Sequence, residues 1–316
     1  MIKPQISKMS ADWGLRFRDV IRLCVWVLVM GGAESQGSEI ELTIGKGPVV
    51  RPPESSEEWF RLERTTDFQT WEIGRDSVAW PTEVAAHRKG VEFNFFRFLP
   101  LSIPDPPYSI GIVGDSTAVG IQQFPLARGW AQELSAFTQD ETRFVMAGDP
   151  GLSTKSFFGS FRERMLTTTT PIVVLVQLGQ IDEFNGQSEV KSTTLKEYRE
   201  NLASIVSLIR GWKGTPILVS PLAARLFEED GRLVPYLVER SAAVREVADE
   251  VGAYMIDLHQ LTSNLYLNGT DDEVRNWGYG DDYHLSVAGA EKVARLVLSA
   301  LPPHLKNHFF VEPEVE

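Results

Sequence analysis

The sequence predicts an α/β fold: a three-layer αβα sandwich with a mostly parallel sheet, preceded by a small amino-terminal extension. From Ser109 to Leu301, short apolar runs alternate with longer segments of helical periodicity. The apolar runs lack the alternation of a strand with one face in water, so they indicate strands buried on both faces. A parallel sheet with helices on each side is the architecture that buries such strands.

Five strands and four helices are expected in this main domain, residues 108–302. In chain order, the strands are the runs SIGIV, RFVMA, PIVVLVQL, TPILVS and AYMID, which begin at residues 109, 143, 171, 215 and 253. Each run ends at or beside Gly, Ser or Asp, which favour turns. The helices are KSFFGSFRERML, LKEYRENLASIVSLIRGW, PYLVERSAAVREVADEV and SVAGAEKVARLVLSAL, at 155–166, 195–212, 235–251 and 286–301.

Three further segments surround the main domain. Residues 1–33 carry five basic side chains before the apolar run LCVWVLVM and the small residues Gly31, Gly32 and Ala33, which is the layout of a signal peptide. We therefore expect a secreted or periplasmic protein; an uncleaved membrane anchor or a buried amphipathic helix are the alternatives. Residues 34–107 form the extension, with short strands at 40–44 and 91–98. Residues 303–316 form a tail whose end, HFFVEPEVE at 308–316, is expected to fray.

The composition argues against several classes of partner and cofactor. The 316 residues include 31 Lys and Arg against 43 Asp and Glu, a formal net charge of -12. Broad electrostatic attraction to nucleic acid or an anionic membrane is therefore not expected. The only cysteine, Cys24, lies within the signal-like segment, so a processed chain has no disulfide. The sequence contains no His-Glu-x-x-His motif, Cys/His metal spacing or phosphate-binding loop, so neither a metal nor another cofactor is implied.

Ser116 stands where the first strand ends, in Gly114-Asp115-Ser116-Thr117. Open parallel sheets carry their chemistry at the carboxyl ends of the strands, which favours a functional serine. A capping function explains the position equally well, since Asp and Ser are preferred at the amino termini of helices. A serine nucleophile would also need a base and an acid that orients the base, from elsewhere in the chain.

Asp281 and His284 form a candidate pair for those two functions. Both lie in DDYHLSVAGA, just before a helix expected to begin near Ser286 or Val287. A carboxylate at this spacing fixes the imidazole tautomer and stabilises the imidazolium when the histidine takes up a proton. Helix capping is again the alternative, and Asp282 competes with Asp281 as the orienting acid. The other four histidines lie outside the expected site: His87, His259, His304 and His308.

Taken together, four segments resemble the conserved blocks of the SGNH, or GDSL-type, hydrolase superfamily. They are GDST after the first strand, AGDPGLSTKSF after the second, VVLVQLGQID at the end of the third, and DDYHLSVAGA before the last helix. Further segments, such as PILVSPLAARLFEEDGRLV and VADEVGAYMIDLHQLTSNLY, are similar in order and spacing to the rhamnogalacturonan acetylesterase branch. The resemblance covers about residues 109–301 and implies a flavodoxin-like sheet and an esterase.

The resemblance also implies roles for individual residues. Ser116 corresponds to the nucleophile, His284 to the general base and Asp281 to its orienting acid. Gly151 matches the glycine whose backbone N–H joins that of Ser116 in an oxyanion hole. A glycine allows the sharp turn and the close approach to substrate that this function requires.

Two positions depart from the superfamily pattern. Ile181 replaces an asparagine whose amide is the third oxyanion donor, and loss of one such donor typically lowers the rate by about 10²- to 10³-fold. Gln180 or Asn185 could supply a donor if the loop is shifted. Near Met146 the superfamily carries a further asparagine, so a supporting hydrogen bond is expected to be missing.

Two functions follow from this pattern. The first is a serine esterase that removes acetyl groups from a polysaccharide, or another small ester, through an acyl-enzyme on Ser116. The second is a catalytically silent carbohydrate-binding protein that kept the fold. Joint retention of Ser116, Asp281 and His284 favours the esterase, whereas Ile181 favours the silent binder. We interpret Arg225, in PLAARLF, as a surface salt-bridge partner, with contact to a substrate carboxylate as the alternative.

Overall fold

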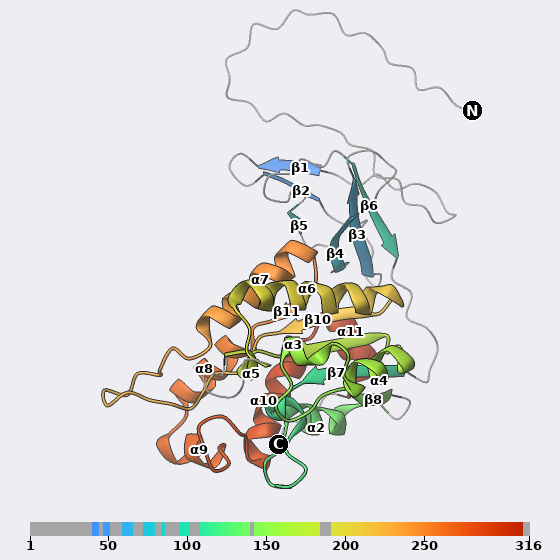
Figure 1. The fold of residues 1–316 in the computed structure, drawn as a ribbon. Helices are drawn as coiled ribbons and strands as arrows, with labels where there is room; N and C mark the ends of the chain where they lie inside the picture. The colour runs from blue at the N-terminus through green and yellow to red at the C-terminus, as the bar shows by residue number, and fades with distance from the viewer. Residues whose placement is uncertain are drawn as a thin grey trace, which may run out of the picture.

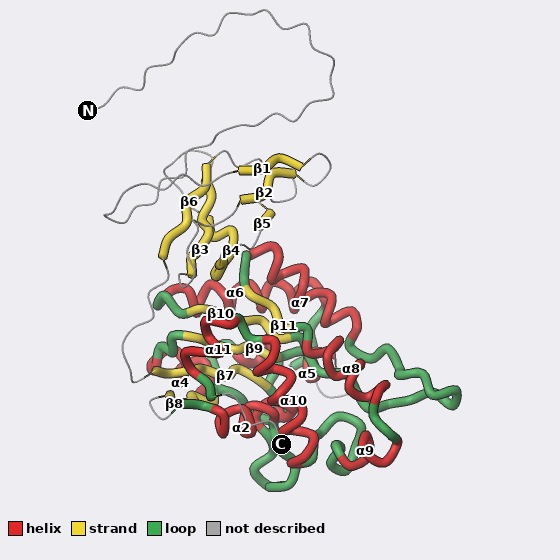
Figure 2. Tube along the Cα trace, turned by 180° about the vertical axis from the view of Figure 1, so that it is seen from behind, coloured by secondary structure: helices red, strands yellow, loops and turns green. Residues whose placement is uncertain are grey.

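A computed structural model describes residues 108–311, except 140–141 and 184–190, together with strands between residues 40 and 100. The segment interpreted as a signal peptide or anchor, residues 1–33, lies outside the described residues. Figures 1 and 2 show the main domain as an α/β sandwich with a central sheet between helices, which confirms the predicted fold class.

One parallel sheet forms the centre of the main domain. Its strands are β7 (Tyr108–Gly114), β8 (Thr142–Met146), β9 (Val173–Gln177), β10 (Thr215–Val219) and β11 (Tyr254–Ile256), each within two residues of the sequence prediction. They lie in the order β8-β7-β9-β10-β11, and all their pairings are parallel. In this flavodoxin-like order, the strand sequence reverses between β7 and β9. The carboxyl ends of these two strands are therefore the expected place for a ligand.

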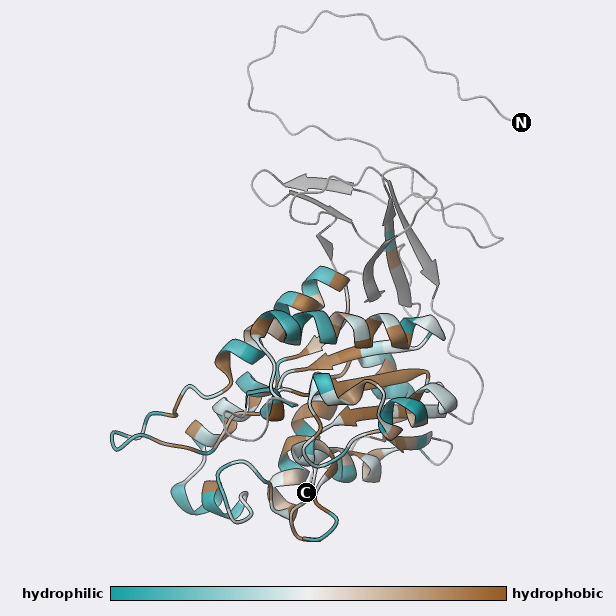
Figure 3. Cartoon of the chain, in the orientation of Figure 1, coloured by the Kyte–Doolittle hydropathy of each residue, from teal (hydrophilic) through white to brown (hydrophobic). Residues whose placement is uncertain are grey.

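Successive side chains of each strand point to opposite faces of the sheet, and both faces are buried. Ile110 and Ile112 of β7 belong to one hydrophobic core, and Val113 belongs to the other. Neighbouring strands divide in the same way, with Leu175 in the first core and Val176 in the second. Figure 3 shows the result: the strands are brown through the middle of the domain, and the helices carry teal residues on their outer sides.

Helices cover both faces of the sheet. The first core includes residues of α2 (Trp130–Leu134), α8 (Leu258–Asn268), α10 (Val287–Ala300) and α11 (Pro303–Phe309). The second includes residues of α3 (Thr154–Phe157), α4 (Phe161–Thr169), α6 (Leu195–Gly211) and α7 (Val238–Val251). Short helices in the connections are α1 (Ser116–Val119), η1 (Ser135–Phe137), α5 (Gln180–Glu183) and α9 (Asp271–Asn276). Among the described helices, none combines the length and apolar character needed to cross a membrane.

The expected helices are present, but the one at 155–166 is broken into α3 and α4. Gly159 adopts φ +73°, a conformation that glycine tolerates and that ends a helix. The hydroxyl of Ser160 then accepts a hydrogen bond of 3.1 Å from the backbone N–H of Glu163 and caps α4. The helix expected at 235–251 begins later, at Val238, because Leu237 is left-handed with φ 64°.

The end of the carboxyl-terminal tail, residues 308–316, was expected to fray, and for residues 308–311 that expectation is wrong. Helix α11 packs against the first core, and Phe309 and Phe310 are 1% and 5% exposed. The backbone N–H of Val311 donates to the carbonyl of Phe137 at 2.7 Å. Burial of two aromatic side chains offsets the conformational entropy that the chain loses when its end becomes ordered.

The described strands of the extension form two small antiparallel sheets. One has the order β1-β2-β5, with β1 (Ile40–Thr43), β2 (Gly47–Val50) and β5 (Val84–Ala85). The other has the order β4-β3-β6, with β4 (Glu72–Ala79), β3 (Trp59–Thr65) and β6 (Phe95–Pro100). Strand β4 lies next to α7 and β11, and both sheets lie above α6 and α7 in the view of Figure 1. The sequence predicted β1 and part of β6, and it missed the others.

Candidate active site

The first strand of the sheet ends at Ser116 because a tight strand-to-helix turn is built there. Asp115 caps α1, and Ser116 is the first residue of that helix. A side chain at Gly114 would collide with the Cβ of Ala118, so only glycine lets the strand and the helix approach this closely. Ser116 is 7% exposed and lies at the carboxyl end of β7, where the strand order reverses. The turn therefore presents the serine hydroxyl at the expected ligand position.

The structure brings the three predicted catalytic side chains into one chain of hydrogen bonds. Ser116 Oγ lies 3.0 Å from His284 Nε2, and His284 Nδ1 lies 2.6 Å from Asp281 Oδ2. Because the carboxylate can only accept, Nδ1 carries the proton and donates it to Asp281. Nε2 is then the acceptor for the serine hydroxyl, and this tautomer is assigned from the hydrogen-bond network. Asp281 and His284 come from the loop before α10, which begins at Val287 as the sequence predicted. The competing Asp282 contributes its backbone carbonyl, which accepts from the N–H of Arg225.

Hydrogen bonds keep the carboxyl of Asp281 ionised. Partial burial raises its pKa, but the backbone N–H groups of His284 and Tyr283 donate to Oδ1 at 2.7 and 2.8 Å, and the imidazole donates to Oδ2. Together these bonds outweigh the burial and hold the pKa of Asp281 below its ordinary value. The negative charge opposite His284 is therefore present throughout the neutral range.

A buried polar network lies behind the serine, and the sequence analysis missed it. Oδ1 of Asp115 accepts from the N–H and the hydroxyl of Thr117, at 2.9 and 2.7 Å. That hydroxyl accepts from Gln177 Nε2 at 3.0 Å, and Gln177 Oε1 accepts from the indole of Trp130 at 2.7 Å. One signal was available, because Gln177 is a polar residue inside an otherwise apolar strand. The network ties the end of β9 to the first turn after β7.

Asp115 provides the first prediction. Desolvation by complete burial raises the pKa of its carboxyl to about 6, although Thr117 donates two bonds to it. The folded protein then binds a proton more readily than the unfolded chain, so this group destabilises the fold as pH rises from about 4 to 6. Asp115→Asn should therefore raise the free energy of unfolding at pH 7 by up to about 3 kcal/mol and change it little at pH 3.5.

Urea unfolding of wild type and Asp115→Asn at several pH values measures this effect. Asp249→Asn, which changes an exposed carboxylate on α7, is the matched control and should follow the wild type. If Asp115→Asn instead lowered the free energy of unfolding equally at neutral and at acid pH, burial of the Asp115 charge would carry no cost.

The loop after β8, which carries Gly151, contacts the end of β7 through Gly148 and Asp149. The N–H of Asp149 donates to the carbonyl of Gly114 at 3.0 Å, and a side chain at Gly148 would collide with the backbone of Gly114. Gly151 has φ +79°, a conformation that most residues avoid, and its carbonyl accepts from Lys191 Nζ at 3.0 Å. These contacts fix the backbone of the loop beside the turn that carries Ser116.

Ile181 lies on α5, directly after β9, and its apolar side chain is half-buried. This side chain has no group that could donate to an oxyanion. Gln180, its neighbour, is buried at 7% exposure, whereas Asn185 lies outside the described residues. Met146, the second departure, ends β8 and packs against the first core, so this position serves the hydrophobic interior.

Asp182 anchors the helix that carries Ile181. Its Oδ1 accepts from the hydroxyls of Thr154 and Thr193, at 2.5 and 2.9 Å, and its Oδ2 accepts from the N–H of Thr154 at 3.0 Å. Burial raises the pKa of Asp182, and these bonds from the two threonines act in the opposite direction. Because Thr154 begins α3, Asp182 connects the loop after β8 to the loop after β9.

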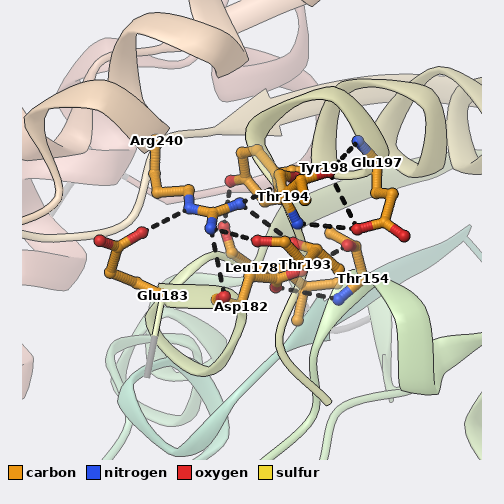
Figure 4. Close-up of polar contacts among 9 residues, drawn as sticks. All are labelled: Thr154, Leu178, Asp182, Glu183, Thr193, Thr194, Glu197, Tyr198 and Arg240. Atoms are coloured by element: carbon orange, nitrogen blue, oxygen red, sulfur yellow. Dashed lines mark hydrogen bonds and ion pairs between the residues drawn. The ribbon is translucent and has the colours of Figure 1, made fainter. Parts of the chain in front are cut away.

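Arg240 of α7 completes this cluster, which Figure 4 shows. Its side chain is 6% exposed, Nε donates to Glu183 Oε2 at 2.7 Å, and Nη2 donates to the carbonyl of Thr193 at 2.6 Å. The guanidinium carbon lies 5.0 Å from the ring centre of Tyr198, within cation–π distance. The sequence carried a signal for this residue, since Arg240 follows Leu237 by three and precedes Val244 by four, the spacing of a core-facing position.

The interpretation of Arg225 as a surface salt-bridge partner is wrong. Its side chain is 8% exposed, and Nη2 donates to the carbonyls of Asp281 and His284 at 3.0 and 2.5 Å. The guanidinium carbon also lies 5.7 Å from the ring centre of Tyr266. The error arose because backbone carbonyls, the partners of this side chain, have no signature in a sequence. His259, which was expected to lie outside the site, has Nε2 2.8 Å from the carbonyl of Tyr236.

A pocket of about 250 Å³ lies beside Gly151. Its lining includes Phe161, which is 63% exposed, and the cationic side chains of Arg162 and Lys191. Arg162 also contacts Asp149 at 3.3 Å. An exposed aromatic ring among polar groups is suited to a sugar, which offers an apolar ring face and many hydroxyls.

Within the described residues, the structure contains no group of three or more side chains that could hold a metal ion.

Comparison with known proteins finds related sequences and a related structure. Residues 112–292 match the GDSL-like Lipase/Acylhydrolase family. The rhamnogalacturonan acetylesterase RhgT of Bacillus subtilis is 26% identical over 223 residues, which cover 64% of this chain and 94% of that protein. The probable rhamnogalacturonan acetylesterase YesY of the same organism is 24% identical over 199 residues, covering 61% of this chain and 91% of its own length. A crystal structure of the Bacillus subtilis protein YXIM superposes with a TM-score of 0.55 at 18% identity, covering 89% of this chain and 87% of that one, which supports the fold.

Proposed function

Because this chain belongs to the GDSL-like lipase/acylhydrolase family and is a carboxylic ester hydrolase, we propose that it deacetylates a carbohydrate through an acyl-enzyme on Ser116. The observation that carries the proposal is the chain of hydrogen bonds from Ser116 Oγ through His284 to Asp281. Nucleophile, base and orienting acid stand in the order that serine hydrolysis requires.

The first half of the reaction forms the acyl-enzyme. Ser116 Oγ attacks the acetyl carbonyl carbon while its proton passes to His284 Nε2, and the carbonyl oxygen becomes an oxyanion. Asp281 stabilises the resulting imidazolium through Nδ1. The tetrahedral intermediate collapses when the bond to the sugar oxygen breaks. His284 Nε2 returns the proton to that oxygen, and the sugar leaves with a free hydroxyl.

The second half releases acetate. A water molecule gives one proton to His284 Nε2 and attacks the carbonyl carbon of acetyl-Ser116. The second tetrahedral intermediate expels Ser116 Oγ, which recovers the proton from the imidazole. In both halves, the backbone N–H groups of Ser116 and Gly151 are the proposed oxyanion donors, supported by the fixed loop beside the end of β7.

The proposed substrate is an O-acetylated polysaccharide, and rhamnogalacturonan is our first choice because both curated relatives are named for it. The pocket beside Gly151 offers Phe161 and its cationic neighbours to a sugar chain, although Ser116 and His284 are not among its lining residues. The chain as a whole has a net charge of -12, so a negatively charged polymer would be recognised by such local contacts and not by the overall field.

Acetate release is the direct test of this function. Acetylated rhamnogalacturonan, acetylated xylan and p-nitrophenyl esters of increasing acyl length should be compared, with Ser116→Ala as the blank. We expect acetate from an acetylated polysaccharide and a preference for acetyl over longer acyl groups. Hydrolysis of long-chain esters without acetate release would contradict the carbohydrate substrate. Polysaccharide binding without any hydrolysis would support the silent binder that Ile181 suggests.

Ile181 provides a prediction about the oxyanion hole. Ile181→Asn restores an amide where the superfamily has its third donor, so kcat should rise by up to about 10²-fold. The gain should appear in kcat more than in KM, because the oxyanion is fully formed only near the transition state. Steady-state kinetics on p-nitrophenyl acetate measures both constants.

Ile181→Leu is the matched control, since it keeps the position apolar and should leave kcat unchanged. An asparagine whose amide finds no partner would cost about 1 to 3 kcal/mol of stability, which thermal unfolding detects. An unchanged kcat with a lower melting temperature would mean that Ile181 belongs to the core and another group, such as Gln180, donates to the oxyanion.

We also propose that the protein is exported. The proposal rests on the basic and apolar layout of residues 1–33. Expression of the full chain should yield a product that begins near residue 34 outside the cytoplasm. An intact amino terminus in the membrane fraction would indicate the anchor instead.

A further inference from the structure

The loop that carries Asp281 and His284 is shaped by hydrogen bonds, among them those from the N–H groups of Tyr283 and His284 to Asp281 Oδ1. It connects α9, which ends at Asn276, to α10, which begins at Val287, and it contains no regular secondary structure. Inside it, the N–H of Tyr279 donates to the carbonyl of His284 at 2.9 Å. The side chain of Asp281 is 43% exposed, so burial alone does not fix it.

Arg225 contacts this loop at three backbone carbonyls. Its own N–H donates to Asp282 at 2.8 Å, and its Nη2 donates to Asp281 at 3.0 Å and to His284 at 2.5 Å. One nitrogen atom therefore bonds the main chain of both the base and its orienting acid. The bonds reach residues 56 and 59 positions further along the sequence, and they join the segment after β10 to the loop before α10.

The guanidinium of Arg225 is itself held in place. It is buried, it lies over the ring of Tyr266, and a Cβ at Gly278 would come within 2.9 to 3.2 Å of its atoms. Glycine at 278 thus leaves the room that the guanidinium needs. Within the described part of the chain, no carboxylate forms an ion pair with this buried cation, and a polar neighbour outside the loop is the hydroxyl of Tyr266. Burial of an unpaired charge is costly, so the fold retains here a cation whose described contacts are largely to the catalytic loop.

We propose that Arg225 is a positioning residue: it sets the place of the His284 imidazole relative to Ser116 by holding the carbonyls of Asp281 and His284. The inference rests on the proposed function of these residues, and Arg225 contacts neither Ser116 nor the imidazole among the described hydrogen bonds. Small errors in the placement of catalytic groups are expensive, since about 1 Å can lower a rate by about 10²-fold.

Two substitutions distinguish the effect of the hydrogen bonds of Arg225 from the effect of its side-chain volume. Arg225→Met keeps much of the volume and removes every donor, so kcat for p-nitrophenyl acetate should fall by about 10- to 100-fold while KM changes less than about threefold. Arg225→Lys keeps a cation with three donors on one nitrogen and should recover part of the loss. Arg232→Met is the matched control, because Arg232 is 78% exposed on the same connection between β10 and α7. It should behave as the wild type.

A spectroscopic reading keeps the test independent of activity. In the wild type, the short Asp281–His284 bond should give a downfield proton NMR signal from Nδ1–H that is protected from exchange with solvent. Arg225→Met should shift or broaden this signal, and Arg232→Met should not. Rates are normalised to the fraction of folded protein, which circular dichroism reports, so a loss of stability alone does not count as positioning.

The outcomes are distinct for the inference and for the proposed function. A fall in kcat together with an altered Nδ1–H signal supports the positioning residue. A kcat within twofold of wild type, or an unchanged signal in Arg225→Met, overturns it even if the melting temperature falls. If the wild type hydrolyses no ester, the proposed function fails, and the NMR comparison alone then decides whether Arg225 orders the Asp281–His284 pair.

Discussion

Ser116→Ala should lower kcat for ester hydrolysis by about 10⁶-fold, since loss of the nucleophile of a serine triad removes most of the rate enhancement. Attack on the acetyl carbonyl requires the Oγ atom that lies 3.0 Å from His284 Nε2, and alanine has no substitute for it. The fold should be almost unaffected, because one partly exposed hydrogen bond contributes about 1 kcal/mol. Thermal unfolding and initial rates on p-nitrophenyl acetate measure the two effects on one preparation.

Covalent labelling provides a second reading of the same variant. A serine-directed organophosphonate should add one adduct to the wild type and none to Ser116→Ala, as mass spectrometry of the intact protein records. Ser204→Ala is a suitable control, because Ser204 is exposed on α6 and its hydroxyl bonds only the carbonyl of Glu200 among the described residues. Activity or labelling that persists in pure Ser116→Ala would place the nucleophile elsewhere.

Asp281→Asn should lower kcat by about 10⁴-fold while the protein remains folded. An asparagine amide facing His284 Nδ1 would donate to it, so the Nε2 atom would carry the proton and could not accept the one from Ser116. Asp282→Asn is the matched control, because in the described structure it is the carboxyl of Asp281 that bonds the imidazole. It should retain activity close to the wild type, and an equal loss in both variants would contradict the assignment of Asp281.

The pH dependence of the two proteins extends this test. The pKa of Asp281 lies below its ordinary value, so the carboxylate stabilises the folded state above about pH 4, and this contribution is lost as pH falls through the lowered pKa. The stability difference between wild type and Asp281→Asn should therefore shrink in acid. Activity of the wild type should rise with pH, because only a neutral imidazole can accept the proton of Ser116. A rate that is flat between about pH 5 and 9 would argue against histidine as the base.

Much of the fold could be predicted from the sequence, because a strand that is buried on both faces has a continuous run of apolar residues. The continuous apolar run of β9 predicts a strand covered on both sides, and the two cores on either face of the sheet are the reason. The break at Gly159 and the ordered end at Phe309 and Phe310 were missed for different reasons. The first depends on a single backbone angle, and the second depends on apolar surface that distant helices provide.

In the candidate site too, local motifs were predictable from the sequence, whereas contacts between distant residues were not. Ser116, Asp281 and His284 could be identified from the sequence because each lies in a short motif next to a predicted element. Their hydrogen-bonded geometry could not, since Ser116 and His284 are 168 residues apart and meet only when the sheet and α10 pack together. Glu183, Thr193 and Arg240 were absent from the prediction for the same reason.

The sequence by itself therefore determined the class of the fold and which residue types stand at the ends of β7 and before α10. Hydrophobic periodicity and short motifs are local, and they persist whatever the rest of the chain does. Only the tertiary structure decided what Arg225, Asp182 and Gln177 do. Their partners are backbone carbonyls and side chains from distant elements, and every residue carries a carbonyl, so nothing in the sequence distinguishes the ones that are bonded.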